Sequence, residues 1–331
     1  MLDIEIKGLT KKFGNFTAVD NISFSVKSGE LFGLLGPNGA GKTTTINMLS
    51  TLVKPTSGKC SVAGFDVQKQ RIDVRESIGI VFQEPALDGR LTGRENLEFH
   101  AMMYGIGKQE RNKKIGEVLE LVELKDKANT IVDKYSGGMK RRLEIARGLI
   151  HEPKVLFLDE PTLGLDAQTR RHIWDYIQKL NREKNVTIIL TTHYMEEADY
   201  LCSRIAIIDK GKIAAIGNPE KLKNILGGDI ITIEVKGDAD RFAKKLKSMR
   251  CVKKVKCPKD IQKNGSTITI TVDHGEKRVP EIIEFAKKNS VRVESVNLRK
   301  PSLEDVFLHF TGRTIRDTEP EGNKISRFHG H

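Results

Sequence analysis

The eight residues 36–43 constrain the fold more than any other stretch of the sequence. They read GPNGAGKT, which fits the pattern G-x-x-x-x-G-K-[ST], and they stand between an apolar run, LFGLLG (31–36), and a helical stretch, TTINMLS. A glycine-rich turn between a strand and a helix directs backbone N–H groups inward, and the helix N-terminus adds positive potential. The segment therefore predicts a phosphate-binding loop on an α/β core.

Single positions within this loop predict how a nucleoside triphosphate would be held. Lys42 would reach the β- and γ-phosphates, and the Thr43 hydroxyl would bind Mg²⁺. The glycines would let the backbone come close to the phosphates. The predicted nucleotide-binding residues of the loop are Gly36, Pro37, Asn38, Gly39, Ala40, Gly41, Lys42, Thr43 and Thr44.

Two acids end another apolar run, VLFLDEP (155–161). Their carboxylates would project at the C-terminal edge of a parallel sheet, where ligands of such sheets bind. Asp159 suits a Mg²⁺ ligand acting through water, and Glu160 suits the base that polarises the attacking water. The alternative is a pair of solvated acids at a strand end, and the phosphate loop favours the catalytic interpretation.

Two further strand ends carry polar side chains. TTH (191–193) ends a strand expected to neighbour that of Asp159, which would place His193 near the γ-phosphate as a sensor. Gln83 ends IGIVFQ (78–83) and would contact the metal or the water, then report the nucleotide state. A structural role is the alternative for each of these two residues.

The first two-thirds of the chain alternates short apolar runs with helical stretches. Runs this apolar fit strands buried on both faces, so they predict a parallel α/β core with connections on both sides. Residues 95–125 have helical spacing and predict a helical insertion between strands. The predicted strands are 31–36, 78–83, 155–161, 186–193 and 204–213.

A break in the pattern falls at GNPEKLKNILGGD (217–229), where Gly-Asn-Pro and Gly-Gly interrupt it. The order of elements after it is βαββαβ, which suits a small ferredoxin-like α+β domain, followed by a short helix, SLEDVFLHF. We expect an ATPase-like domain over 1–222, with a helical subdomain at about 88–150, and an accessory domain over 228–312. Residues 313–331 predict a disordered tail, in which His329 and His331 would bind no metal.

The net charge of +12 is concentrated toward the C-terminus. Residues 241–263 hold ten Lys or Arg residues and one acid, Asp260. The simplest interpretation is a solvated helix face, and the alternatives are attraction to anionic lipid heads or to nucleic acid. Aromatic residues do not interleave with this basic run, which argues against a stacking platform for single strands.

The cysteines and the apolar runs suggest a cytosolic protein. Cys60, Cys202, Cys251 and Cys257 lack metal-ligand spacing and predict reduced thiols, with a Cys251–Cys257 disulfide as the alternative. No apolar run approaches the roughly 18 residues that span a bilayer, and the N-terminus has no apolar signal core.

Six motifs together resemble those of the ATP-binding-cassette (ABC) ATPases. GPNGAGKTT, Gln83, YSGGM (135–139), VLFLDEP, LGLDA (163–167) and His193 occur in the order and rough spacing of that family, over about residues 2–220. The chain looks like the nucleotide-binding subunit of an ABC transporter. The resemblance implies a P-loop cassette fold with a helical subdomain, and ATP hydrolysis with Mg²⁺.

The resemblance also gives a role to the second glycine turn. Two ATPase domains of this family pack head to tail, so that Ser136, Gly137 and Gly138 of one subunit would face the triphosphate held by its partner. The helix after this turn would aim its positive end at the anion. One motif set is present, so a homodimer is expected, with a heterodimer as the alternative.

Three more positions follow from the resemblance. Phe13 would stack on adenine, where Tyr is more common, although an ordinary edge-strand aromatic is the alternative. Asp166 matches the loop that couples the two sites across the dimer. Met139 departs from the usual Gln of the signature, so its contacts to the partner's nucleotide would be weaker or differently tuned.

The C-terminal end of the chain indicates which branch of the ABC family it resembles. LRKPSLEDVFLHFTGR (298–313) resembles the closing signature of the daunorubicin-resistance type of ATPase, which works with a separate transmembrane subunit. This implies an exporter of drug-like, lipid or other small substrates, peripheral on the inner face of the cell membrane. The alternatives are a soluble ABC ATPase that acts on nucleic acid or ribosomes, and a C-terminal domain that senses a ligand and restrains the ATPase.

Overall fold

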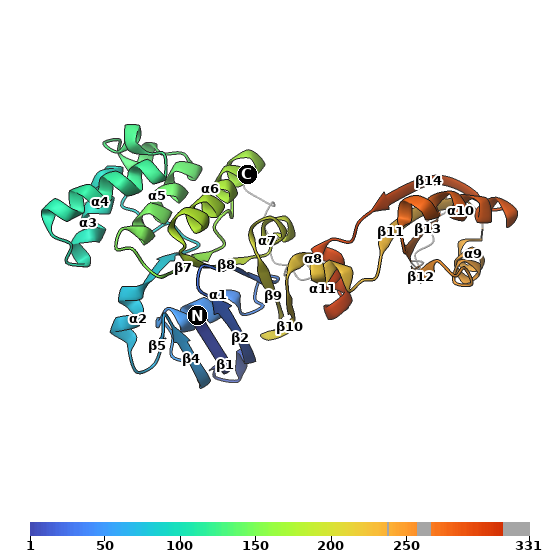
Figure 1. The fold of residues 1–331 in the computed structure, drawn as a ribbon, viewed down its shortest axis with the longest axis horizontal. Helices are drawn as coiled ribbons and strands as arrows, with labels where there is room; N and C mark the ends of the chain where they lie inside the picture. The colour runs from blue at the N-terminus through green and yellow to red at the C-terminus, as the bar shows by residue number, and fades with distance from the viewer. Residues whose placement is uncertain (237, 257–265, 314–331) are drawn as a thin grey trace, which may run out of the picture. The chain divides into compact units, whose positions relative to one another are not determined.

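The computed structural model describes residues 1–236, 238–256 and 266–313. The described chain divides into two compact units (Figure 1). The first unit holds residues 1–219 together with Arg313, and the second holds residues 220–312. The break expected at 217–229 contains this division. Each unit has its own cluster of buried apolar side chains, and each is described here by itself.

A six-stranded sheet forms the centre of the first unit within the described residues. Its strand order is β10-β9-β3-β8-β7-β6, and the neighbours from β9 to β6 are parallel, as predicted. The residues of β3, β7 and β8 are all buried, which explains their uninterrupted apolar sequences. The strands are β3 (Leu31–Leu35), β6 (Ile78–Val81), β7 (Val155–Asp159), β8 (Thr187–Thr192), β9 (Arg204–Asp209) and β10 (Lys212–Gly217).

The prediction of one strand over residues 204–213 is wrong. The chain reverses at Lys210 and Gly211, which have φ values of 47° and 76°, and β10 returns antiparallel to β9. Two consecutive residues with positive φ form the kind of tight turn that matches the twist of a hairpin. The apolar run therefore supplies two strands, and the sheet is parallel except at this edge.

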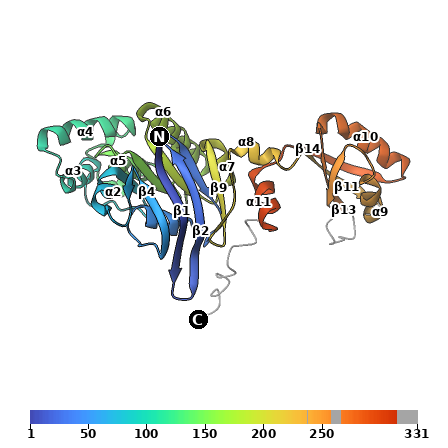
Figure 2. The same cartoon turned by 60° about the horizontal axis from the view of Figure 1, so that its bottom comes forward.

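A second, antiparallel sheet was not predicted. Its order is β2-β1-β4-β5, and Figure 2 shows β1 and β2 side by side as a long hairpin. Buried and exposed residues roughly alternate along β1, and several register shifts interrupt its pairing with β2. This weaker alternation explains why the sequence pattern missed it. The strands are β1 (Leu2–Phe13), β2 (Phe16–Lys27), β4 (Ser57–Val62) and β5 (Phe65–Asp66).

Helices occupy the connections between the strands of the first unit. Helix α1 follows the phosphate loop and buries Ile46, Met48 and Leu49 in the core. The predicted helical insertion lies between β6 and β7, where α3, α4 and α5 pack on one another (Figure 1). The helices are α1 (Lys42–Leu49), α2 (Arg71–Ser77), α3 (Gly93–Met103), α4 (Lys108–Leu121), α5 (Gly137–Leu149), α6 (Ala167–Lys184) and α7 (Met195–Leu201), with 3₁₀ turns η1 (Lys125–Lys127) and η2 (Val132–Lys134).

The second unit has the predicted ferredoxin-like βαββαβ arrangement. Its four-stranded sheet has the order β12-β13-β11-β14 with all neighbours antiparallel, and α9 and α10 pack against it. Alternate residues of β11 and β13, such as Ile233 and Ile270, fill the core. The elements are α8 (Pro219–Asn224), β11 (Asp229–Lys236), α9 (Ala239–Leu246), β12 (Val252–Lys256), β13 (Ser266–Val272), α10 (Gly275–Lys288), β14 (Arg292–Arg299) and α11 (Leu303–Thr311).

Cysteine chemistry and membrane spans can be tested within the described residues. Cys60, Cys202 and Cys251 are buried free thiols, and burial raises the pKa of Cys60 to about 12. Cys257 lies outside the described residues, as do the predicted tail from Thr314 and its histidines. None of the described helices combines the length and the apolar character needed to cross a membrane.

Candidate functional site

The phosphate loop joins β3 to α1, as its sequence predicts. Helix α1 begins at Lys42, and its first intrahelical hydrogen bond runs from the Thr45 N–H to the Gly41 carbonyl (2.9 Å). The N–H groups of the first turn before Thr45 therefore have no partner within the helix. Gly41 has a φ of 103°, and a Cβ there would lie 2.5 Å from the Ala18 carbonyl oxygen. Only glycine fits this position.

Lys42 is the buried cation of the site. Its side chain is 4 % exposed, and its ammonium donates to the carbonyl oxygens of Gly36 (2.8 Å) and Pro37 (3.1 Å). Its Nζ also lies 3.2 Å from Glu160 Oε1. Burial lowers the pKa of Lys42, while the neighbouring carboxylates of Glu160 and Asp159 oppose that shift. The charge is thus held where the loop can offer it to an anion.

Thr43 and Asp159 come together from distant parts of the chain. The Thr43 hydroxyl donates to Asp159 Oδ1 (3.2 Å), and the Thr191 hydroxyl donates to the same oxygen. Asp159 is buried at the end of β7. A hydroxyl and a carboxylate side by side are hard oxygen donors, which is the ligand type that Mg²⁺ prefers. The donor set therefore fits the predicted ion.

Glu160 is held in an unusual conformation and is tied on both sides. Its φ is 47°, a left-handed value that is uncommon for a residue other than glycine. Its N–H donates to the Thr191 backbone oxygen (3.2 Å) and Oγ1 (3.0 Å), and its Oε2 lies 3.1 Å from His193 Nδ1. Burial favours a raised pKa for this carboxyl, but the hydrogen bond from His193 and the charge of Lys42 outweigh it and lower the pKa. Glu160 is therefore a carboxyl with a lowered pKa that is held in one orientation between Lys42 and His193.

Gln83 lies in the segment that follows β6. Its side chain is exposed, as are those of its neighbours Glu84 and Pro85. Backbone groups on either side of it, at Phe82 and Ala86, are hydrogen-bonded to helix α5. The segment that carries Gln83 is thus fixed at two points while the side chain stays free to meet a ligand.

Arg141 is a buried site residue that the sequence analysis missed. Its guanidinium donates to three carbonyl oxygens, those of Phe82, Asp159 and Pro161. The available signal was its position in α5, because Arg141 stands one helical turn before the buried Ile145 and shares its face. A charged residue on the apolar face of an amphipathic helix indicates a specific partner.

The Ser-Gly-Gly turn caps α5. The Ser136 hydroxyl accepts a hydrogen bond from the Met139 N–H (3.2 Å), and Ser136 and Gly137 are exposed. A Cβ on the buried Gly138 would lie 2.5 Å from Thr169 Cγ2. Among the hydrogen bonds and ion pairs of the described residues, none joins residues 136–139 to the loop 36–43. The turn presents an exposed helix N-terminus that this chain leaves open.

Asp166 and Phe13 lie apart from these contacts. Asp166 caps α6, accepting from the Thr169 N–H (2.9 Å) and hydroxyl (2.6 Å), and these bonds lower the pKa of its carboxyl. Phe13 ends β1 and is half exposed, with Lys11 Nζ 4.7 Å from its ring centroid. An exposed aromatic face with a cation beside it can stack on a base.

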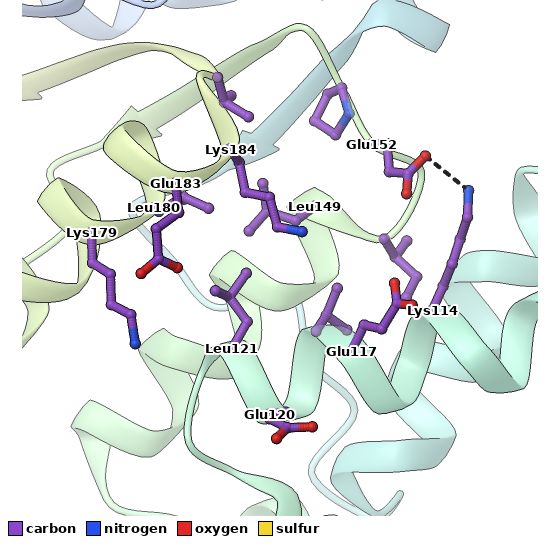
Figure 3. Close-up of a pocket in the computed structure, with 14 residues that line it drawn as sticks. Lys114, Glu117, Glu120, Leu121, Leu149, Glu152, Lys179, Leu180, Glu183 and Lys184 are labelled. Atoms are coloured by element: carbon purple, nitrogen blue, oxygen red, sulfur yellow. Dashed lines mark hydrogen bonds and ion pairs between the residues drawn. The ribbon is translucent and has the colours of Figure 1, made fainter.

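A pocket of about 580 Å³ lies elsewhere, between α4 and α6 (Figure 3). Leucines such as Leu121, Leu149 and Leu180 line it together with lysines and glutamates, and Lys114 pairs with Glu152 across one edge (3.4 Å). None of the predicted site residues lines it. Its mixed charges select no particular ligand, so the phosphate loop remains the candidate site.

Family models match both units. The model described as ABC transporter matches residues 19–163, and the model of the C-terminal domain of DrrA1-3-like ATP-binding proteins matches residues 217–311. The first model ends just after Glu160, so it includes the phosphate loop, the Ser-Gly-Gly turn and both acids.

Curated proteins match nearly the whole chain. The linearmycin resistance ATP-binding protein LnrL of Bacillus subtilis is 43 % identical over 315 residues, covering 95 % of this chain and all of that protein. The daunorubicin resistance ATP-binding protein DrrA2 of Streptomyces coeruleorubidus is 40 % identical over 320 residues, covering 96 % and 97 % of the two chains.

Solved structures match about two-thirds of the chain. CbiO1 of Clostridium perfringens, part of an ABC transporter complex, has a TM-score of 0.63 at 29 % identity and covers 68 % of this chain and 93 % of its own. A dimeric ATP-binding cassette, MJ0796, bound to ADP and phosphate after hydrolysis, has a TM-score of 0.59 at 31 % identity and covers 65 % and 98 %.

Proposed function

Because the chain belongs to the family of ABC transporter ATP-binding proteins, we propose that it powers the export of small molecules through a separate transmembrane subunit. Its activity is ATP hydrolysis. The observation that carries the proposal is the contact of Lys42, on the phosphate loop, with Glu160, which His193 holds from the other side. This arrangement places a cation for the phosphates beside a base for water.

The chemistry follows from three side chains. Lys42 would move its charge from Glu160 to the β- and γ-phosphates of ATP, which releases one carboxylate oxygen. Glu160 would then accept a hydrogen bond and a proton from the attacking water. His193 would orient Glu160 and contact the γ-phosphate. Gln83 would reach the same phosphate from the segment after β6.

Mg²⁺ would be held by oxygen atoms of Thr43, Asp159 and Gln83. The hydroxyl of Thr43 and the carboxylate of Asp159 are already neighbours, and the amide oxygen of Gln83 is of the same hard type. When bound, the ion would neutralise negative charge on the phosphate oxygens.

The site would be completed by a second copy of the chain. Among the described residues, no hydrogen bond or ion pair joins the exposed corner of Ser136 and Gly137 to the phosphate loop of the same chain, and the helix behind it supplies positive potential. The similar MJ0796 cassette is a dimer by its title. Two copies in head-to-tail contact would close two sites, with Asp166 coupling them and Phe13 stacking on adenine.

The transmembrane subunit would dock on helix α3. Phe99, Met102 and Met103 on this helix are more than half exposed, an apolar patch of the kind that marks a protein interface. Two resistance proteins similar to this chain are named for linearmycin and daunorubicin, so the cargo we propose is a drug-like, lipid or similar small molecule. Docking would place the chain on the inner face of the cell membrane.

The test is a Glu160→Gln variant on a sizing column. It should dimerise in the presence of ATP and Mg²⁺, because the contacts to the phosphates remain. It should hydrolyse almost no ATP, because the amide of Gln does not accept a proton from water. Lys42→Ala is the matched control and should stay monomeric, since it lacks the phosphate cation. A Glu160→Gln chain that stays monomeric with ATP, even in the presence of its transmembrane subunit, would refute the proposed ATP-driven dimer.

A further inference from the structure

Arg141 connects the helix of the Ser-Gly-Gly turn to two other motif segments. Its side chain is 7 % exposed and uses all three guanidinium nitrogens. Nη1 donates to the Phe82 carbonyl (2.6 Å), Nη2 to the Asp159 carbonyl (3.0 Å) and Nε to the Pro161 carbonyl (2.6 Å). The planar fork of arginine carries donors on three separate nitrogens at fixed positions, whereas lysine offers its three N–H groups from one nitrogen.

Together with Glu144, Arg141 fixes the segment that carries Gln83. Glu144 is fully buried one turn further along α5, and its Oε1 accepts from the Ala86 N–H (2.8 Å). The contact of Arg141 with Phe82 holds the other end of the segment. Because both anchors belong to one rigid helix, residues 82–86 must follow any movement of α5.

The same guanidinium brackets Glu160. Asp159 and Pro161, whose carbonyls it binds, are the chain neighbours on either side of Glu160. Glu160 has the left-handed φ of 47°, a conformation that persists only where the surroundings enforce it. Two hydrogen bonds from Arg141 supply part of that enforcement, and those between the Glu160 N–H and Thr191 supply another part.

The charge of Arg141 is balanced within the site. Burial lowers the pKa of the guanidinium, and the carboxylates of Glu144, Asp159 and Glu197 oppose the shift. A buried cation with three carboxylates around it and three carbonyl acceptors is satisfied where it stands. Removing it would take this donor away from the carbonyls of Phe82, Asp159 and Pro161.

We propose that Arg141 is a positioning residue that fixes Gln83 and Glu160 relative to α5, the helix capped by Ser136. A movement of that helix would then move Gln83, Glu160 and Ser136 together. This rests on the proposed ATPase site. Glu160 and Gln83 of one subunit would thereby be linked to the Ser136 and Gly137 corner that the same subunit presents to its partner. ATP bound at the phosphate loop would bias the position of α5, and therefore of Ser136, through one side chain.

The test compares Arg141→Gln with Arg111→Gln in the full-length protein. Arg111 is also a largely buried arginine, and it donates to the Ile106 carbonyl and to Glu98. Among the described residues, no hydrogen bond or ion pair joins it to a motif segment. We expect Arg141→Gln to lower kcat by about 10- to 100-fold with the KM for ATP changed less than about threefold, because misplaced catalytic groups slow the chemical step without removing binding. The control should match the wild type in both constants.

A double-mutant cycle with Gln83→Ala separates positioning from general damage. If Arg141 acts partly through Gln83, its loss should lower kcat by a clearly smaller factor in the Gln83→Ala background than in the wild type. Arg141→Lys, which keeps the charge and loses the fork, should show the same split between kcat and KM if the glutamine variant does not fold.

Two results would overturn the inference while leaving the proposed function intact. One is an unchanged kcat in a folded Arg141 variant of an active enzyme. The other is an equal loss in both backgrounds of the cycle. A wild-type chain without ATPase activity would overturn the proposed function first.

Discussion

At the scale of single residues, Glu197 shows how a buried carboxyl is accommodated near the site. It lies in α7, fully buried, four residues after His193. Its Oε1 accepts from the Thr162 hydroxyl (2.7 Å) and from the Trp174 indole N–H (2.8 Å). Burial raises the pKa of Glu197 against these bonds.

We predict that Glu197→Ala lowers the free energy of unfolding by about 2–4 kcal/mol, since it leaves two buried donors unpaired and opens a cavity. Glu197→Gln, which keeps an acceptor, should lose much less. Trp174 is the chain's single tryptophan, so its fluorescence during urea unfolding measures both variants. Equal losses in the two variants would contradict the hydrogen-bond account.

The same pair predicts a dependence on pH. A carboxyl whose folded pKa is raised stabilises the fold below its unfolded pKa, and that contribution is lost as the pH rises through the folded pKa. Glutamine has no such proton. The difference in unfolding free energy between wild type and Glu197→Gln should therefore move in favour of the glutamine variant as the pH rises above about 4.3, the ordinary pKa of a glutamate carboxyl. A shift in favour of the wild type over this range would show that Glu197 is stabilised as an anion.

At the scale of elements, helix α3 has an N-terminus fixed by hydrogen bonds and an exposed apolar C-terminal half. Thr92 and Glu95 form a capping box at its start, and Asn96 bonds to Asp88 and Thr92. Toward its C-terminus the helix exposes Phe99, Met102 and Met103. An element fixed at one end and apolar at its surface presents a rigid docking face.

We predict that replacing Phe99 and Met103 together by Asp abolishes co-purification with the transmembrane subunit. Charged groups at the centre of an apolar interface are desolvated without a partner, which costs more than the contact provides. Both side chains are exposed, so ATP-dependent dimerisation in the Glu160→Gln background should persist. Retained co-purification would place the docking face elsewhere.

At the scale of the whole chain, two separate cores imply two folding units. The buried apolar cluster around Phe32 and Phe157 belongs to the first unit, and the cluster around Phe242 and Ile270 belongs to the second. Every predicted nucleotide-binding and catalytic residue lies in the first unit. The basic stretch that begins at 241 lies in the second, and the similar proteins described above give no support for a nucleic-acid partner.

We predict that calorimetry of the full chain resolves two unfolding transitions, of which ATP shifts mainly one. A ligand stabilises only the unit whose native state binds it. A chain that ends at Asn218 should keep the ATP-sensitive transition and bind ATP within a factor of about three of the full-length affinity. Loss of ATP binding in that shorter chain would show that the second unit is part of the site. An ATPase rate unchanged by the truncation would count against the idea that the second unit restrains turnover.

The sequence by itself determined those features whose causes are local. The phosphate loop could be recognised because its glycines, Lys42 and Thr43 are consecutive and lie between a strand and a helix. The two acids after β7 and the βαββαβ order were readable for the same reason, since periodicity and turn residues act over short distances. The hairpin at Lys210 could not be predicted in this way, because one apolar run contains two strands and the turn between them.

Only the tertiary structure decided which distant groups meet. Arg141 binds carbonyls 18, 20 and 59 residues away, and Glu197 binds donors 23 and 35 residues away. No local pattern shows which distant backbone carbonyl a side chain will bind, since every residue offers a carbonyl. The partner of a buried charge is selected by packing, and packing exists only once the strands and helices have come together.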